Sequence, residues 1–545
     1  MERPPLQETS AWEKLQAETE NINRPEMHLS QLIREPGRLE AFSLQVPGMF
    51  FDFSRQRVTR QILARLHELS EERDALSHFR EMTRGVKVNR TEHRAALHTS
   101  ARSFSDDTVI VDGVDVMSDI RRVRDELRRF SAQIIQGEIT GSTGKRFSHV
   151  VVIGIGGSYL GTEFVSESLR AYADTGIRLH YLSNVDIHNF GRIVSEIDPP
   201  ATLWVVISKS YTTAETMANE HLARTFMEEK GLDPAQHVVT VTAKGSPGDV
   251  SSSLREAASG SLATFHMFDY IGGRYSVTSA VGGVPLSLYL GYERFERFLK
   301  GAEEMDRHAA TAPVQENIPL TAALLSLWNS TLLGYPAQAV IPYASPLSKL
   351  AAHVQQLNME SNGKSVSISG EPLPHTTGYI VFGEPGTNAQ HSFFQLLHQG
   401  RPVPVEFIGV VAPQYPQYQT RSKGVTNHQE LWANLISQPM ALAIGKKDEN
   451  LARSFSGNRP SSTILLPDLT PESVGRLLSF YEAKTVYEAF LWGINPFDQF
   501  GVELGKQLAT DIRKEMARLN NDRDHDFGNV LPIMKYYLKK LYAND

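Results

Sequence analysis

A run of β-branched residues that ends in a cluster of glycines constrains the fold of this chain more than any other stretch. Residues Val150–Gly161 read V-V-V-I-G-I-G-G-S-Y-L-G. The apolar half predicts a strand buried on both faces, and the spacing of apolar residues after Leu160 predicts a helix. A strand, a glycine turn and a helix aim backbone N–H groups at an anion, and the hydroxyl of Ser158 suits a compact phosphate. An ordinary strand-to-helix connection has the same pattern, so this stretch alone leaves the function open.

Length and composition limit the classes of protein that the chain can belong to. Its 545 residues are more than one hydrophobic core usually holds, so we expect two domains with a helical extension. A net charge of -7 and a pI of about 6.2 argue against nucleic acid as the main partner. The chain contains no cysteine, which excludes disulfides, thiolate metal sites and a cysteine nucleophile. No signal pattern or membrane-spanning apolar run is present, so we expect a cytoplasmic protein without a membrane partner.

Hydrophobic periodicity divides the chain into a helical start and two α/β regions. Helical spacing recurs before Phe147, and from Ser148 strands and helices alternate, which predicts a parallel sheet covered by helices on both faces. A second alternating region follows the helical stretch 284–333. The expected helices are Ala11–Glu20, Val58–Leu76 and Arg121–Ile135, with a charged helical stretch at Asp511–Tyr542. The expected strands are His149–Ile155, Ile177–Leu182, Thr202–Ser208, His237–Thr242, Gln338–Ile341, Tyr379–Gly383, Val403–Val411 and Ser462–Leu466.

Two further turns add hydroxyl groups and cations to the first α/β region. Ile207–Thr216 places small hydroxyl residues and Lys209 between a strand and a helix, although a capping box between Thr212 and Glu215 would explain the same pattern. Gly272 and Gly273 let the backbone approach a ligand and present Arg274 beside it, although an exposed arginine is usually a solvated surface group.

Proton-transfer chemistry is indicated at three places in the second half. A helix expected to begin near Ser345 should end just after Glu360. The negative end of a helix dipole disfavours an ionised carboxylate, so the placement of Glu360 there needs another explanation, such as a role as a base. His391 follows a Pro/Gly loop at the start of a helix, and Lys506 lies one turn into another. Each residue alone also fits an ordinary structural role.

Seven sequence blocks, taken together, resemble the glucose-6-phosphate isomerase family in the family's order. Val88–Arg102 is similar to N-x-T-E-x-R-A-x-L-H-x-A-x-R, with Ser100 at the last alanine. The glycine turn matches G-I-G-G-S-x-L-G, and the second turn resembles S-K-T-x-T-T-x-E-T with Ser210 at a threonine. The remaining blocks are Gly272–Ser276, Met359–Lys364, Gly383–His391 and Gly501–Lys506.

The resemblance implies an α/β fold with two sugar-isomerase (SIS) type doubly wound parallel-sheet domains and helical terminal arms. It implies an N-terminal arm at 1–120, a first domain at 121–290 with the phosphate-binding turns, a second at 291–510 and a C-terminal arm at 511–545. It also implies a homodimer with a shared active site, and an isomerase that interconverts glucose 6-phosphate and fructose 6-phosphate without metal or organic cofactor.

The family's roles, carried over to matching positions, divide into proton transfer and substrate binding. The resemblance makes Glu360 the base that works through a cis-enediol, Arg274 the group that stabilises the intermediate, and His391 with Lys506 the pair that opens the sugar ring. In the family this histidine comes from the neighbouring subunit. The implied substrate-binding residues are Gly157, Ser158, Ser208, Lys209, Ser210, Thr213, Gln356 and Gln499. Departures at Tyr159, Phe500 and 268–271 leave the substrate preference open.

Three alternatives remain at this level. A sugar-phosphate isomerase that prefers another epimer, such as mannose 6-phosphate, would carry similar turns. A non-catalytic sugar-phosphate-binding regulator would keep the binding turns but has no need of Glu360, His391 and Lys506 together. A dinucleotide oxidoreductase is disfavoured because Tyr159 replaces the third glycine of the G-x-G-x-x-G fingerprint and no acidic residue ends the next strand.

Overall fold

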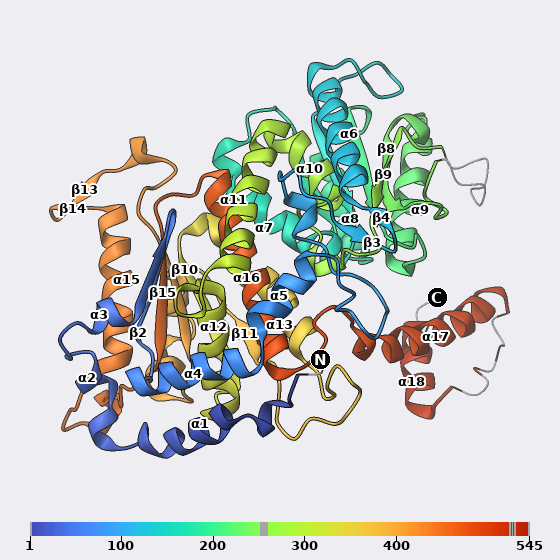
Figure 1. Cartoon of the computed structure of the whole chain (residues 1–545). Helices are drawn as coiled ribbons and strands as arrows, with labels where there is room; N and C mark the ends of the chain where they lie inside the picture. Colours follow the sequence, from blue (N-terminus) through green and yellow to red (C-terminus); the bar gives the residue numbers. More distant parts are fainter. Residues whose placement is uncertain (1–2, 251–259, 523–524, 526, 528–529, 543–545) are drawn as a thin grey trace. The chain divides into compact units, whose positions relative to one another are not determined.

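The computed structural model of the chain describes residues 3–250, 260–522, 525, 527 and 530–542 (Figure 1). The chain falls into two compact units, Met1–Phe497 and Asp498–Asp545. Across the described residues, no helix combines the length and the apolarity needed to cross a membrane. Helices of the first unit are α1 (Ser10–Asn21), α2 (Leu29–Leu32), α3 (Arg38–Ala41), α4 (Arg60–Glu72), α5 (Ala75–Thr83), α6 (Met117–Gln136), α7 (Leu160–Ser168), α8 (Ile187–Glu196), α9 (Ala214–Glu229), α10 (Ala280–Leu290), α11 (Tyr292–Thr311), α12 (Ile318–Leu327), α13 (Leu350–Asn362), α14 (Phe394–Gln399), α15 (Asn427–Ile444) and α16 (Pro471–Trp492).

A parallel sheet with the strand order β6-β5-β7-β8-β9 forms the first α/β domain. Its strands are β5 (His149–Ile153), β6 (Arg178–Leu182), β7 (Thr202–Ile207), β8 (Val238–Ala243) and β9 (Ala263–Met267). Alternate residues of β5 face opposite sides: Val150 and Val152 join the core beneath α6 and α10, whereas Val151 and Ile153 pack with residues of α8 and α9. Four of these strands were expected from the sequence, and β9 was not.

A mixed sheet with the order β1-β2-β15-β12-β10-β11 forms the second domain. The predicted strands are confirmed as β10 (Ala337–Tyr343), β11 (Ile380–Phe382), β12 (Val405–Val410) and β15 (Ser461–Leu466), and they run parallel. The two sheets confirm the predicted α/β class with two parallel-sheet domains. The second sheet also gains an antiparallel edge, which the sequence analysis did not foresee.

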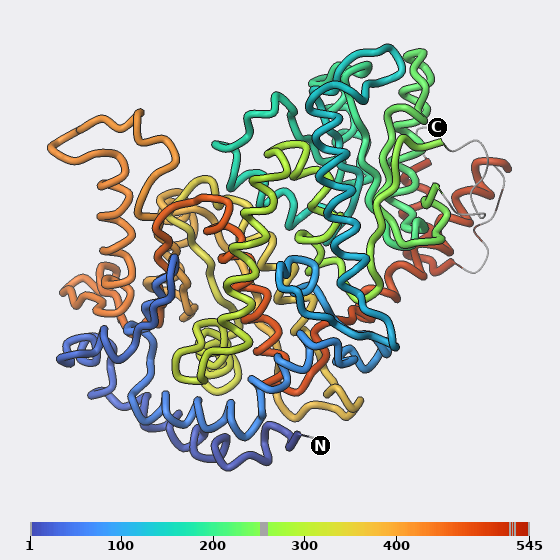
Figure 2. The backbone as a smooth tube through the Cα atoms, turned by 45° about the horizontal axis from the view of Figure 1, so that its top comes forward, coloured from blue at the N-terminus to red at the C-terminus, as the bar shows by residue number. Residues whose placement is uncertain are grey.

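That edge comes from the N-terminal stretch, which we expected to be mostly helical. A hairpin of β1 (Ser43–Val46) and β2 (Met49–Arg55) pairs antiparallel with β15, more than 400 residues later in the chain (Figures 1 and 2). Phe51 and Phe53 of β2 are buried in the main core, so hydrophobic burial fixes the hairpin on the sheet.

The single helix expected at 58–76 is instead α4 and α5, separated at Asp74, whose φ of 49° ends the helix.

Helix α16 lies at the centre of the first unit, and every residue from Pro471 to Trp492 except Glu472 is buried. It packs along α11, α12 and α13. Two glycines allow α11 and α16 to approach closely. A Cβ on Gly301 would lie 2.0 Å from the backbone oxygen of Glu472, and one on Gly475 would lie 1.9 Å from that of Phe298.

The second unit contains α17 (Glu503–Asn521) and α18 (Pro532–Leu541), which agrees with the helical pattern at the C-terminus. Leu519, Phe527 and Leu538 form its small apolar core.

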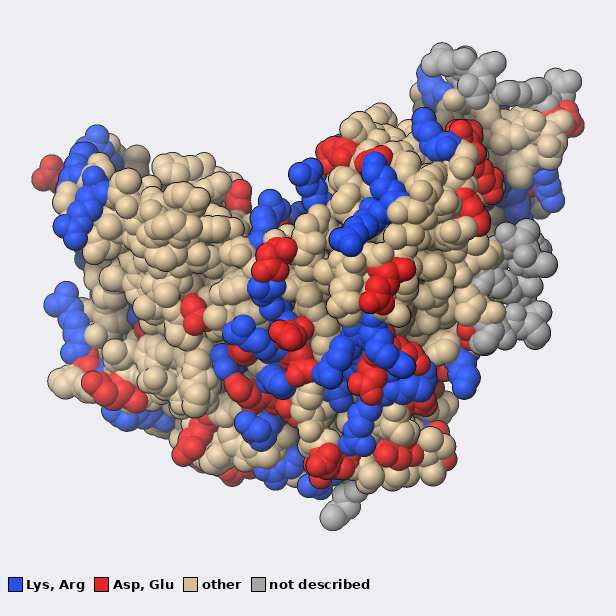
Figure 3. All heavy atoms as spheres, turned by 90° about the horizontal axis from the view of Figure 1, so that it is seen from above, with Lys and Arg blue, Asp and Glu red and all other residues tan. Residues whose placement is uncertain are grey.

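On the face of the molecule seen in Figure 3, Lys and Arg side chains lie among Asp and Glu, so that face offers no broad cationic surface of the kind that binds nucleic acid.

Candidate active site

The strand order of the first sheet places a crevice at the carboxyl ends of β5 and β7. The chain leaves β5 into α7, which packs into the main core, and leaves β7 into α9, which covers the opposite face of the sheet. Ligands of doubly wound sheets bind where neighbouring strands lead to opposite faces. Both turns that the sequence predicted to bind phosphate lie at this crevice.

The first turn, η4 (Gly156–Ser158), combines a left-handed backbone with a close approach. Gly156 has a φ of +59°, and α7 begins after Tyr159 without a side-chain cap. A Cβ on Gly157 would lie 2.2 Å from the backbone carbon of Gly273, so the backbones of the two turns are in direct contact. Gly157 is therefore required at this point because no side chain fits between the turns.

In the second turn, 208–213, hydroxyl groups hydrogen-bond within the turn and do not cap α9. Ser208 Oγ accepts a hydrogen bond from the backbone N–H of Tyr211, and Ser210 Oγ lies 2.6 Å from Thr212 Oγ1. Thr213 is the N-cap of α9, but no side chain caps this helix. The alternative of a capping box between Thr212 and Glu215 is therefore wrong, and the N-terminus of α9 keeps its backbone donors for a ligand.

A cavity of about 440 Å³ lies between the two turns. Lys209 donates to the backbone oxygens of Asp269 (3.0 Å) and Ile271 (3.3 Å) at its wall, and burial lowers the pKa of this lysine. Hydroxyl groups and cations dominate the lining, which suits a phosphate. The polar lining residues are Arg94, Ser158, Ser208, Lys209, Ser210, Thr213, Thr216 and Asp269.

Arg94 was missed as a candidate by the sequence analysis. It comes from the loop after Val88, and it lines the cavity although more than sixty residues separate it from the first turn and more than one hundred from the second. The block that contains it served only to support the family resemblance. The sequence signal that could have identified Arg94 was a basic side chain within a block whose spacing resembles that of the family.

Glu360 lies in the last turn of α13, as predicted, although the helix begins later than expected. Residues Ser345–Leu347 form a 3₁₀ turn, and α13 starts at Leu350. Gln356 Nε2 donates to Glu360 Oε2 over 3.1 Å, and the guanidinium of Arg274 lies 3.5 Å from the same oxygen. The Glu360 side chain remains 25% exposed while that of Arg274 is only 2% exposed, so a ligand can reach the carboxylate above a buried cation.

Arg274 is fixed in 3₁₀ helix η8 (Gly273–Tyr275) by neighbours that are not carboxylates. Its Nε donates to Ser361 Oγ at 2.7 Å, and a terminal nitrogen donates to the backbone oxygen of Pro496 at 2.5 Å. Ser361 Oγ in turn lies 2.9 Å from the hydroxyl of Tyr275. These contacts hold the guanidinium in place before any substrate arrives, as electrostatic stabilisation requires.

The two halves of the site form one contiguous cluster. The turn at Gly157 touches Gly273, which precedes Arg274, and a Cβ on Gly156 would lie 3.1 Å from Gln356 Nε2. The structure therefore joins the phosphate turns, the buried arginine and the carboxylate of Glu360, although they are spread over a stretch of more than two hundred residues.

His391 lies on another element of the first unit. His391 ends the 3₁₀ helix η12 (Asn388–His391) and is exposed, and no hydrogen bond or ion pair among the described residues links it to Glu360. Its helix is held by Gln390, which accepts from Tyr343 and donates to Asn434. Gln499 and Lys506 belong to the second unit, where Lys506 is exposed in the first turn of α17.

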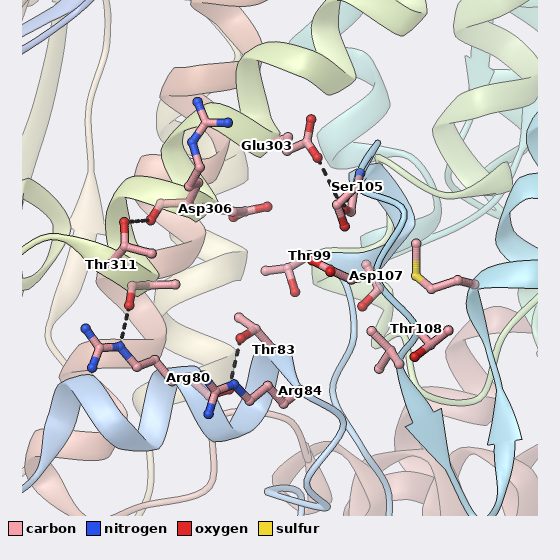
Figure 4. Close-up of a pocket in the computed structure, with 16 residues that line it drawn as sticks. Arg80, Thr83, Arg84, Thr99, Ser105, Asp107, Thr108, Glu303, Asp306 and Thr311 are labelled. Carbon is pink, nitrogen blue, oxygen red and sulfur yellow. Dashed lines mark hydrogen bonds between the residues drawn. The ribbon is translucent and has the colours of Figure 1, made fainter.

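A larger cavity among the described residues lies elsewhere. It measures about 640 Å³ and is lined mainly by α5, the loop 99–109 and α11 (Figure 4). Two of its acidic groups are already engaged, since Glu303 accepts from the backbone of Phe104 and Asp306 accepts from Arg102. None of the predicted site residues lines it, so cavity size is a poor guide to the chemistry here.

Among the described residues, no group of three His, Asp or Glu side chains is arranged to hold a metal ion.

Comparisons with known proteins agree with this geometry. The profile of the phosphoglucose isomerase family matches residues 52–530. The chain is 63% identical to the glucose-6-phosphate isomerase of Desulfosudis oleivorans over 536 residues, which cover 98% of both proteins. It is 42% identical to the cytosolic glucose-6-phosphate isomerase of Arabidopsis thaliana over 98% of this chain and 97% of that one. The crystal structure of a glucose-6-phosphate isomerase from Chlamydia trachomatis matches with a TM-score of 0.90 and 38% identity, covering 99% of this chain and all of that one.

Proposed function

The chain belongs to the phosphoglucose isomerase family, and on this premise we propose how its residues divide the work of the reaction. The protein reversibly converts glucose 6-phosphate into fructose 6-phosphate in glycolysis and gluconeogenesis, and its α/β domains are of the sugar-isomerase type. The observation that carries the assignment of roles is the exposed carboxylate of Glu360 beside the buried guanidinium of Arg274, next to a cavity lined by hydroxyl groups and cations.

The phosphate group binds in the cavity between the two turns. Ser158, Ser208, Ser210 and Thr213 supply hydroxyl donors, and the N-terminus of α9 adds uncapped backbone N–H groups. Lys209 supplies a positive charge held in place by the backbone oxygens of Asp269 and Ile271. Gly157 lets the turn that carries Ser158 lie against the turn that carries Arg274, and so sets the distance between phosphate and reacting carbons.

Ring opening precedes isomerisation and is the task of His391 and Lys506. A proton must reach the ring oxygen while the C1 hydroxyl loses one, and histidine is suited to this transfer near neutral pH. The exposure of His391 supports delivery of this side chain to the active site of a second subunit. We therefore propose a homodimer with shared active sites, in which Gln499 contacts sugar hydroxyls.

Glu360 then moves the proton between C2 and C1 of the open chain. Its carboxylate takes the proton from C2 of the aldose, and the electron pair of that C–H bond forms the C1–C2 double bond of the cis-enediol while the carbonyl electrons on C1 move to their oxygen. That oxygen takes up the proton of the C2 hydroxyl, the oxygen on C2 becomes the new carbonyl, and Glu360 returns its proton to C1. Arg274, 3.5 Å from Glu360, stabilises the negative charge that develops on the enediol oxygens, and Gln356 orients both the carboxylate and the sugar hydroxyls.

Domain boundaries, location and cofactor use are part of the same proposal. We propose an N-terminal arm at 1–120, whose hairpin β1–β2 extends the sheet of the second domain, sugar-isomerase domains at 121–290 and 291–510, and a C-terminal arm at 511–545. A cytoplasmic location is supported by the cytosolic plant relative. The proposed proton transfers use only side chains of this chain and require no metal or organic cofactor.

Proton NMR in deuterated water tests the assignment of the base. With fructose 6-phosphate, the wild type should form glucose 6-phosphate that carries deuterium at C2, and Glu360→Gln should abolish both product and exchange. The exposed Glu371→Gln is the matched control and should keep full activity. Continued exchange in Glu360→Gln would remove Glu360 from the role of base, and binding without any product in the wild type would favour a sugar-phosphate-binding regulator.

A further inference from the structure

A second carboxylate, Glu488, holds the helix that carries Glu360. Glu488 lies on α16 and is fully buried, with no exposed surface. Its Oε2 accepts hydrogen bonds from Asn358 Nδ2 at 2.5 Å and from Asn362 Nδ2 at 2.8 Å. Its Oε1 accepts from the hydroxyl of Tyr379 at 2.7 Å. The carboxylate is therefore surrounded by neutral donors, two of them on α13.

The two asparagines lie on the face of α13 opposite to the active site. Asn358 and Asn362 are four residues apart and so lie one above the other on one side of the helix. Glu360 is two residues from each, about 200° around the helix axis, and it shares the opposite face with Gln356. Both asparagines are buried, whereas Glu360 is partly exposed next to Arg274.

This arrangement fixes the orientation of the last helical turn. The end of an α-helix lacks intrahelical partners for its final carbonyls and tends to fray, and α13 ends only two residues after Glu360. Glu488 binds α13 through Asn358 and Asn362, which lie two residues before and two residues after Glu360. These hydrogen bonds prevent the last turn from rotating or unwinding. A buried carboxylate is costly to desolvate, so it stabilises the fold only while its donors remain in place.

We propose that Glu488 is a positioning residue, which sets the position of the Glu360 carboxylate over the substrate by holding Asn358 and Asn362. The proposal rests on the role of Glu360 as the base. A displacement of about 1 Å at a reacting group can cost on the order of 100-fold in rate, so a loose last turn would slow proton transfer at C2. It would leave ring opening intact, because that step is assigned to His391 and Lys506.

Two complementary substitutions test the proposal. Glu488→Gln removes the negative charge and replaces one carboxylate oxygen by an NH2 donor, which then faces either the hydroxyl of Tyr379 or the amide donors of the two asparagines, and Asn358→Asp places a carboxylate against Glu488. The double variant Glu488→Gln/Asn358→Asp restores a donor opposite an acceptor. We expect each single substitution to lower kcat for isomerisation roughly tenfold with KM within about twofold, and the double variant to recover most of the loss.

Exchange between the α and β anomers of glucose 6-phosphate, followed by NMR, separates positioning from general damage. Ring opening and closure interconvert the anomers without any proton transfer at C2. The single variants should keep anomer exchange within about twofold of the wild type while isomerisation falls, whereas partial unfolding would lower both rates together. Asn358→Ala, which removes one donor without adding a charge, provides the same comparison if a charged single variant does not fold.

Glu406→Gln is the matched control. Glu406 lies on β12, is equally buried and accepts from Tyr481 and Lys484, but it does not touch α13. It should leave the ratio of isomerisation to anomer exchange unchanged. An unchanged ratio in Glu488→Gln, or no recovery in the double variant, would overturn the proposal. If Glu360→Gln itself retained isomerisation, the assignment of the base would fail instead, and the two failures are thereby distinguished.

Discussion

Single residues in the site owe their position to neutral neighbours rather than to ion pairs alone. Arg274 is held by Ser361 Oγ and the backbone oxygen of Pro496, and Lys209 by the backbone oxygens of Asp269 and Ile271. Backbone oxygens orient a cation without neutralising its charge. Lys209 also lies 3.6 Å from a carboxylate oxygen of Asp269 and Arg274 3.5 Å from one of Glu360, so each cation has one carboxylate beside these neutral acceptors.

Replacing Arg274 by lysine keeps the charge and removes this fixed geometry. We expect Arg274→Lys to lower kcat about 100-fold, with a smaller change in KM, because a lysine cannot reach Ser361 and Pro496 while also facing the enediol. Steady-state kinetics with fructose 6-phosphate measure the effect, and a thermal melt checks that the variant is folded. A kcat within about threefold of the wild type would contradict the role of the guanidinium.

Arg94 provides a prediction for substrate binding. It lines the phosphate cavity, whereas the nearby Arg90 lines a different one. Because hydrogen bonds to charged groups contribute about 1.5–3 kcal/mol, Arg94→Ala should raise KM for fructose 6-phosphate by roughly tenfold or more and weaken competitive inhibition by inorganic phosphate. Arg90→Ala is the control and should change neither. Equal effects of the two substitutions would show that general charge, not a phosphate contact, is responsible.

At the scale of elements, α16 shows how a helix rich in charged residues can be a core element. Glu482, Lys484 and Glu488 are all buried on it, and each contacts a partner on another element: Arg102, Glu406 and Asn358, respectively. The close crossing with α11 through Gly301 and Gly475 leaves no room for a side chain. The position of α16 in the core therefore depends on backbone contact as much as on apolar burial.

Gly301→Ala tests that crossing. The added Cβ would lie 2.0 Å from a backbone oxygen, so the helices must separate, and we expect the free energy of unfolding to fall by about 3 kcal/mol. Gly191, in α8, has nothing within 4 Å of its added Cβ, so Gly191→Ala should instead raise it by about 0.5–1 kcal/mol. Denaturant unfolding of both variants measures the difference. Equal stabilities would mean that the crossing adapts without cost.

At the scale of the first unit, the two domains share one hydrophobic core, and His353 lies within it. This residue of α13 stacks on Phe164 of α7 with ring centroids 5.5 Å apart. It is 2% exposed, its Nε2 has no hydrogen-bond partner in the described part of the chain, and burial lowers its pKa to about 4. A neutral imidazole thus links the helix after the glycine turn with the helix that carries Glu360.

The low pKa of His353 makes stability depend on pH. Below pH 6.5 the unfolded chain binds a proton at this histidine, but the folded chain does not until about pH 4, so protonation favours unfolding in this window. Between pH 7 and 4.5 the wild type should lose roughly 2 kcal/mol more stability than His353→Gln, in which this titration is absent. Denaturant unfolding across this pH range measures the difference between the two proteins, and parallel pH profiles would contradict it.

The sequence by itself determined the local features of this protein. The apolar run at Val150–Ile153 and the glycines after it predicted a buried strand and an anion-binding turn, because side-chain period and glycine content act over a few residues. The same reasoning located the end of α13 at Glu360, and the resemblance of seven blocks indicated the family. It did not foresee β1, β2, β9 or a buried α16, whose side chains make sense only with distant partners.

The tertiary structure alone decided which of these local features meet. The contact of Gly157 with Gly273, the place of Arg94 in the cavity beside Ser158 and the hydrogen bonds of Glu488 to α13 join residues more than sixty positions apart. Such contacts follow from sheet order and helix packing, which a linear pattern does not encode. Burial of a polar group also depends on hydrogen-bond partners that only the folded chain supplies. For this reason the sequence predicts an exposed position for a charged residue such as Glu488, whereas the structure places it in the core.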